Sequence, residues 1–103
     1  MATLIKTFAK TVTTAGTRVA LSASRLMVPS FVIRANAANT GVIYIGDVTV
    51  TSANGMFLAA SEANNKFGVS VNGGKYREFD LSKVYIDASV NGEGVRVEYL
   101  LEE

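Results

Sequence analysis

Turn signals built from asparagine and glycine interrupt this sequence at short intervals, and the segments between them are rich in β-branched side chains. The 13 Val, 5 Ile and 9 Thr make up 27 of the 103 residues, and such side chains pack well on a pleated strand. Asn and Gly readily adopt the positive φ angles that tight chain reversals need. Short strands separated by frequent turns are typical of an all-β sandwich or barrel. The turn signals lie at Ala15-Gly16, Asn39–Gly41, Asn54-Gly55, Asn72–Gly74 and Asn91–Gly94.

The clearest predicted strand is segment 27–36. Its alternation places Phe31, Ile33 and Ala35 on one face and the residues between them on the other. Pro29, near its start, suits a first position or an edge strand. Residues 59–65 are expected to form a loop. Further strands are expected at 8–14, 17–22 and 41–45, and three hairpins are expected to join 48–52 with 56–59, 66–71 with 75–79, and 83–90 with 95–101.

The first twelve residues have helical spacing of apolar side chains, but their many threonines disfavour a helix. We therefore expect residues 1–12 to form an extended N-terminal arm or an edge strand. Residues 13–103 are expected to form one antiparallel β-sandwich domain or a partly closed barrel. Because Lys6 and Lys10 interrupt the apolar character of the start, and because no run of 18 apolar residues occurs, neither a signal peptide nor a membrane span is predicted.

The composition argues against enzymatic chemistry. There is no His and no Cys, which removes the commonest general base, the commonest metal ligand and the thiol nucleophile. No cofactor is expected. Asp80, Asp87 and Glu93 could converge on a calcium ion, but solvated acids beside turns are the favoured interpretation. The run Lys75–Phe79 interleaves bases with aromatics, as single-strand nucleic-acid platforms do, although core packing is favoured there.

Charge is balanced overall but divided along the chain. The net charge of +1 gives no reason to expect nucleic acid or a membrane as partner. Residues 1–46 carry five bases and no acid, whereas residues 47–103 carry nine acids and five bases. The bases could guard edge strands against aggregation, or they could dock on an acidic neighbour such as another copy of the chain. Only 18 % of the residues are charged, which favours a homo-oligomer whose surface is partly covered by other chains. The candidate interface residues are Leu4, Ile5, Lys6, Phe8, Lys10, Arg18, Arg25 and Arg34.

Several motifs, in order, resemble a family of small virion structural proteins of tailed bacteriophages. The motifs are Thr13–Ser22, Asn39–Asp47, Ser52–Gly55, Val84–Ala88 and Asn91–Val95, and the similarity in their order and spacing extends over most of the chain. The resemblance implies a jelly-roll-like β-sandwich that assembles as a trimer or dimer. It further implies a decoration or cement protein that is made in the host cytoplasm and located on the capsid surface of the virion. Its expected partner is the major capsid protein of the same phage, whose subunits it would bridge and stabilise. The resemblance implies no catalytic residues.

Two alternatives from other classes stay open. The first is a tail or fibre module that binds host-surface glycan, with Tyr44, Tyr76, Tyr85 and the turn asparagines on an exposed face. The absence of Trp counts against it. The second is a tail-tube or head–tail connector subunit. A copy number per particle that matches a single closed ring would identify this function.

Overall fold

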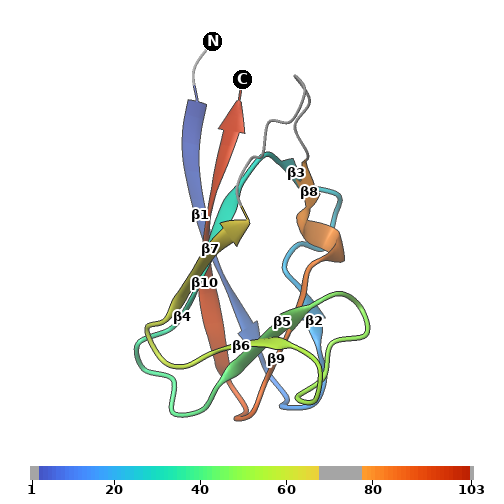
Figure 1. Ribbon diagram of the computed structural model, residues 1–103, viewed down its shortest axis with the longest axis vertical. Helices are drawn as coiled ribbons and strands as arrows, with labels where there is room; N and C mark the ends of the chain where they lie inside the picture. Colours follow the sequence, from blue (N-terminus) through green and yellow to red (C-terminus); the bar gives the residue numbers. More distant parts are fainter. Residues whose placement is uncertain (1–2, 68–77, 103) are drawn as a thin grey trace.

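The computed structural model describes residues 3–67 and 78–102, and within them every element is a strand except one short 3-10 turn, η1 (Leu81–Lys83) (Figure 1). The strands form two four-stranded antiparallel sheets, in the orders β1-β10-β4-β7 and β2-β9-β5-β6, and a small sheet, β3-β8. The predicted all-β, antiparallel class is therefore confirmed. The strands are β1 (Thr3–Val12), β2 (Val19–Ala20), β3 (Met27–Val28), β4 (Phe31–Ala35), β5 (Ile43–Gly46), β6 (Met56–Leu58), β7 (Ala63–Phe67), β8 (Phe79–Asp80), β9 (Tyr85–Ala88) and β10 (Glu93–Glu102).

The pairing of the strands is nested. β1 pairs with β10, β2 with β9, β3 with β8, β4 with β7 and β5 with β6, in each case antiparallel. The chain is thus one long hairpin whose closing loop lies between β5 and β6. Two further pairings, β4 with β10 and β5 with β9, fold this hairpin into the two larger sheets. As a consequence, the first and last strands lie side by side, and the start of β1 and the end of β10 lie at the same end of the molecule (Figure 1).

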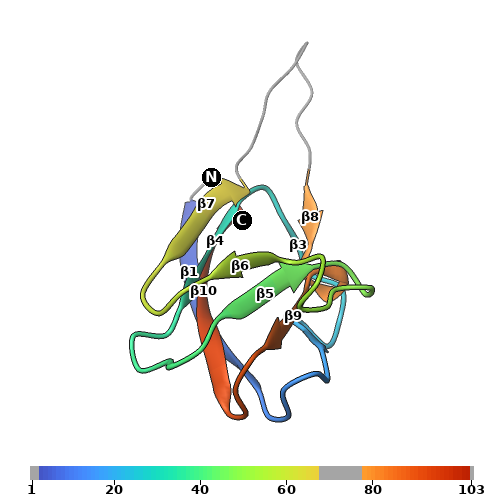
Figure 2. The ribbon, with the colours of Figure 1, turned by 60° about the horizontal axis from the view of Figure 1, so that its bottom comes forward.

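The two larger sheets share one hydrophobic core. On β4 the predicted alternation is confirmed, because Phe31, Ile33 and Ala35 are buried whereas Arg34 between them is exposed. Among the described residues no strand pairing joins the two larger sheets. They face each other as layers in a sandwich-like arrangement and do not close into the barrel that the sequence also allowed (Figure 2). The core also includes Val12, Val28, Ile43, Ile45, Leu81, Ile86, Val95 and Val97.

The N-terminal segment is an edge strand in its described part. β1 pairs with β10 from Thr3 opposite Glu102 to Val12 opposite Glu93. Val12 is fully buried, and Phe8 packs against the core. Of the two alternatives predicted for residues 1–12, the free arm is therefore not what residues 3–12 form.

Two of the predicted turns connect different sheets and do not close hairpins. The predicted hairpin of 83–90 with 95–101 is wrong, because β9 and β10 belong to different sheets. The turn between them carries the chain across the core, with Gly92 at a positive φ of 80°. The segment that contains Gly16, at φ 89°, likewise leads from β1 in one sheet to β2 in the other. Each strand has the alternation expected of a half-buried strand, but alternation does not say which strand lies next to it.

Other boundaries also differ from the predictions. Segment 27–36 is divided at Pro29 into β3 and β4, because proline has no N–H to donate to a ladder. The predicted strand 48–52 is a loop, and the strand that pairs with β6 is β5. The predicted loop 59–65 ends early, since β7 begins at Ala63. The turn expected at 72–74, with most of its hairpin, lies outside the described residues.

Candidate binding surface on the outer face of the first sheet

The outer face of the first sheet carries an apolar patch at the end where the chain termini lie. Ile5 on β1 is directly opposite Leu100 on β10 in the register. Their exposed fractions are 74 % and 36 %, so both present apolar surface to solvent. They border a hollow of about 260 Å³. The hollow is lined by Ile5, Ser30, Phe31, Val32, Glu98, Tyr99 and Leu100. An exposed apolar hollow of this kind is a candidate contact surface for another protein.

The same end of the sheet has an open edge. β1 is the first strand in its sheet, with β10 on one side and no strand on the other among the described residues. An edge strand presents backbone N–H and C=O groups that another chain can pair with. Lys6 is exposed and Lys10 half-buried on this strand, and lysines on an edge strand discourage indiscriminate pairing. The edge can therefore contact a partner, but it is protected against uncontrolled sheet extension.

The structure divides the predicted apolar anchors of β1 between its two faces. Phe8 lies on the core side and packs edge-on against Tyr99, with ring centroids 5.9 Å apart. Leu4 has the same parity along the strand and is half-buried. Ile5 has the opposite parity and points away from the core. Of the three predicted anchors, only Ile5 is placed to contact a partner without disturbing the sheet.

The three predicted arginines are all exposed, but each lies beside a different group. Arg18 lies in the connection from β1 to β2; the pKa of Asp47 is lowered mainly by the hydrogen bond from the Thr49 hydroxyl, and the charge of Arg18 adds a smaller contribution. Arg25 lies just before β3; the pKa of Asp80 is lowered mainly by the hydrogen bond from the Ser82 hydroxyl, and the charge of Arg25 adds a smaller contribution. Arg34, on β4, donates a hydrogen bond from Nη1 to the Ser61 carbonyl oxygen at 3.0 Å.

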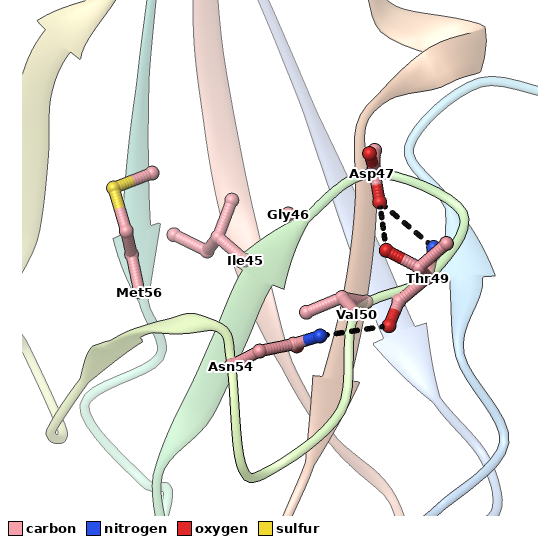
Figure 3. Close-up of a pocket in the computed structure, with 7 residues that line it drawn as sticks. All are labelled: Ile45, Gly46, Asp47, Thr49, Val50, Asn54 and Met56. Carbon is pink, nitrogen blue, oxygen red and sulfur yellow. Dashed lines mark hydrogen bonds between the residues drawn. The ribbon is translucent and has the colours of Figure 1, made fainter.

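A second hollow, of about 330 Å³, lies beside the loop that joins β5 to β6 (Figure 3). The carboxylate of Asp47 accepts hydrogen bonds from the backbone N–H of Thr49, at 2.8 Å, and from its hydroxyl. The bond from that hydroxyl is the main cause that lowers the pKa of Asp47 from its ordinary value of 3.8. The Asn54 side chain donates to the Thr49 carbonyl oxygen at 3.2 Å and accepts from the Thr51 N–H at 2.7 Å. These hydrogen bonds hold the segment between β5 and β6 as a loop. The sequence pattern predicted a strand at 48–52 and therefore did not indicate the hollow.

The three acids considered for calcium bind three different parts of the backbone. Asp80 accepts from the Ser82 N–H and hydroxyl. Asp87 is buried and accepts from the Gly16 N–H at 2.9 Å. Glu93 accepts from the N–H groups of Thr40 and Gly41. In residues 3–67 and 78–102 no group of three or more acidic side chains gathers to hold a metal ion.

The outer face of the second sheet carries aromatic side chains. Tyr44 on β5 is opposite Phe57 on β6, and Phe57 is 68 % exposed. Tyr85 on β9 is opposite Gly46 and shares the outward parity of Tyr44. Two of the three tyrosines considered for glycan binding therefore lie on one face, and Tyr76 lies outside the described residues.

Comparisons with protein-family models, with curated proteins and with solved structures found no match to this chain. The part of the chain that the structure describes contains no long apolar helix of the kind that crosses a membrane.

Proposed function

We propose that this protein is a non-enzymatic structural subunit of a tailed phage particle, bound to the outer capsid shell as a decoration or cement protein. The observation that carries the proposal is the nested pairing of the ten strands that the structure describes, from β1 with β10 inward to β5 with β6. A long hairpin rolled into two facing sheets is the topology of a jelly roll, a fold that viral capsid proteins use. Many unrelated functions occur on the same fold, so the topology supports the class and the surface has to support the role.

The outer face of the first sheet supports docking on a shell. Ile5 leaves most of its side chain in water, which is unfavourable for a free monomer and favourable once a partner covers it. The neighbouring hollow can receive an apolar side chain of the shell, and the open edge of β1 can add backbone hydrogen bonds. A cement protein that bridges several capsid subunits needs only modest contacts, because each bound contact raises the effective concentration for the next.

The test is binding of the purified full chain to phage heads that lack it, measured by co-sedimentation. Ile5→Lys should reduce occupancy while leaving the melting temperature unchanged, because the side chain is exposed. Val48→Lys is the matched control, since Val48 is also an exposed apolar residue but lies in the loop after β5. Failure of the wild-type chain to bind heads would overturn the proposed function. Binding that Ile5→Lys leaves intact would overturn this face as the docking surface.

A second candidate function, a tail or fibre module that binds glycan, is favoured by the aromatic face of the second sheet. Tyr44 and Phe57 are cross-strand neighbours, and flat aromatic rings can stack on the apolar face of a sugar. Binding of the full chain to a glycan array, lost in Phe57→Ala and retained in Ile5→Lys, would select this function over capsid decoration.

A further inference from the structure

Two arginines face each other across the first sheet. Arg34 on β4 is directly opposite Arg96 on β10. The adjacent pairs, Ile33 opposite Val97 and Ala35 opposite Val95, are in the core and essentially inaccessible to solvent. Shifting the register by one residue would expose that core, so the packing holds the two arginines together. Like charges directly opposite on neighbouring strands are unfavourable, and the fold therefore maintains a repulsion that it could have avoided.

A hollow of about 300 Å³ lies beside this pair; its described lining includes the donor side chains of both arginines and of Asn36, and none of these lining residues is acidic. Arg34 uses one N–H on the Ser61 carbonyl oxygen, and a guanidinium has five N–H groups in all. Arg96 is exposed, and its side chain forms no hydrogen bond or ion pair with the residues that the structure describes. Most of the donors of both arginines thus remain for a ligand. The lining residues are Arg34, Ala35, Asn36, Ala37, Ser61 and Arg96.

The backbone on the other side of the hollow is strained. Ser61 has a φ of 67°, in the left-handed region that non-glycine residues seldom adopt. Its N–H donates to the Ala35 carbonyl oxygen at 3.1 Å, and the Ala35 N–H donates to the Glu62 carbonyl oxygen at 2.9 Å. These bonds fix the strained turn against β4, next to Arg34. Strained residues that the surrounding structure holds in place are concentrated at binding sites.

We infer that the hollow between Arg34, Arg96 and Ser61 is an oxyanion-binding site. The ligand is a group that presents at least two oxygens, either a phosphate-type anion or a carboxylate of another protein chain. Paired guanidinium N–H groups bind such oxygens in a bidentate manner, and an anion placed between the two arginines cancels their repulsion. This inference does not depend on the proposed function.

The experiment is an NMR titration of the full chain, with the backbone amides of Arg34, Asn36, Ser61 and Arg96 as reporters. Inorganic phosphate should shift these amides saturably, with sodium chloride at equal ionic strength as the reference. A second titration with N-acetyl-glutamate amide shows whether a carboxylate is bound in preference to phosphate; saturation with either ligand supports the site. Arg96→Gln should weaken binding by about tenfold, the effect expected for losing a charge-assisted hydrogen bond.

Arg25→Gln is the matched control, because it removes an equal charge from an exposed arginine outside the hollow. Thermal unfolding provides a second measurement, the change in melting temperature that phosphate causes, which distinguishes a specific site from a general loss of positive charge. Without added anion, Arg96→Gln should raise the melting temperature, and phosphate should raise that of the wild type but not that of the variant. Shifts that do not saturate, or an equal loss of binding in Arg25→Gln, would overturn the inference. So would a lower melting temperature for Arg96→Gln without anion.

Discussion

The side chain of Asn39 and the backbone of Gly94 form a two-way hydrogen bond although 55 residues separate them. The Asn39 Nδ2 donates to the Gly94 carbonyl oxygen at 2.9 Å, and the Asn39 Oδ1 accepts from the Gly94 N–H at 3.4 Å. Asn39 is only 9 % exposed, so water cannot replace these bonds. The contact fixes the connection between β4 and β5 to the start of β10, where Gly94 is opposite Thr11 of β1.

Asn39→Ala should lower the free energy of unfolding by about 1–2 kcal/mol, because it leaves the buried Gly94 N–H without its partner. The Gly94 carbonyl oxygen keeps a bond from the Asn36 N–H at 3.1 Å, which limits the loss. Urea denaturation measures the change. Asn36→Ala is the control, since the Asn36 side chain is exposed and the change should stay within about 0.5 kcal/mol.

Gly94→Ala should destabilise the protein far more than Gly92→Ala. A Cβ on Gly94 would overlap the Lys10 carbonyl oxygen and lie 2.8 Å from the Thr11 Cα, so β1 would have to move. The expected cost is about 3 kcal/mol. A Cβ on Gly92 would meet no atom within 4 Å. The cost of Gly92→Ala is therefore only that of holding an alanine at the left-handed φ of 80°, about 1 kcal/mol. Equal melting temperatures for the two variants would contradict the close contact of β1 with β10.

The stability of the fold should decrease in acid, in part through Glu93. The bond from the Thr40 N–H is the main cause that holds the pKa of Glu93 below its ordinary value of 4.5, with further bonds from the Gly41 N–H and the Thr40 hydroxyl, while burial opposes them. Because the folded pKa is below the unfolded one, the stabilisation is present above pH 4.5 and is lost as the pH falls through the folded pKa.

Urea midpoints measured from neutral to acidic pH check this expectation. Glu93→Gln should be less stable than the wild type at neutral pH and should lose less stability on acidification. Glu98→Gln, which removes an equal charge from the same strand, is the control. A wild-type and a Glu93→Gln protein whose midpoints fall in parallel would show that this carboxylate does not contribute.

Phe8→Ala and Ile5→Ala distinguish an integrated edge strand from a loosely attached arm. Phe8 packs against Tyr99 and the core, so its truncation should cost about 2 kcal/mol. Ile5 faces solvent, and its truncation should change the free energy of unfolding by less than about 0.5 kcal/mol. Chemical denaturation of both variants provides the measurement. If Phe8→Ala were as neutral as Ile5→Ala, β1 would not be part of the stable sheet in solution.

The local sequence pattern was sufficient to predict the fold class and the buried faces of single strands. The β-branched runs and the turn residues indicated an all-β chain, and the alternation from Phe31 to Ala35 identified the buried face of β4. Both follow from side-chain sterics and the two-residue period of a strand, which need no partner to be read.

The choice of neighbours depended on the whole tertiary structure. Among the described strands only β5 and β6 pair with the next strand in sequence, while β1 pairs with β10 across the full length of the chain. Alternation records which face of a strand is buried but not which strand lies beside it, and the nested order arises from burying both sheets against one core. For this reason Gly94 looked like a turn residue and is instead a point of close strand contact, and the opposition of Arg34 and Arg96 was invisible until the register of β4 and β10 was known.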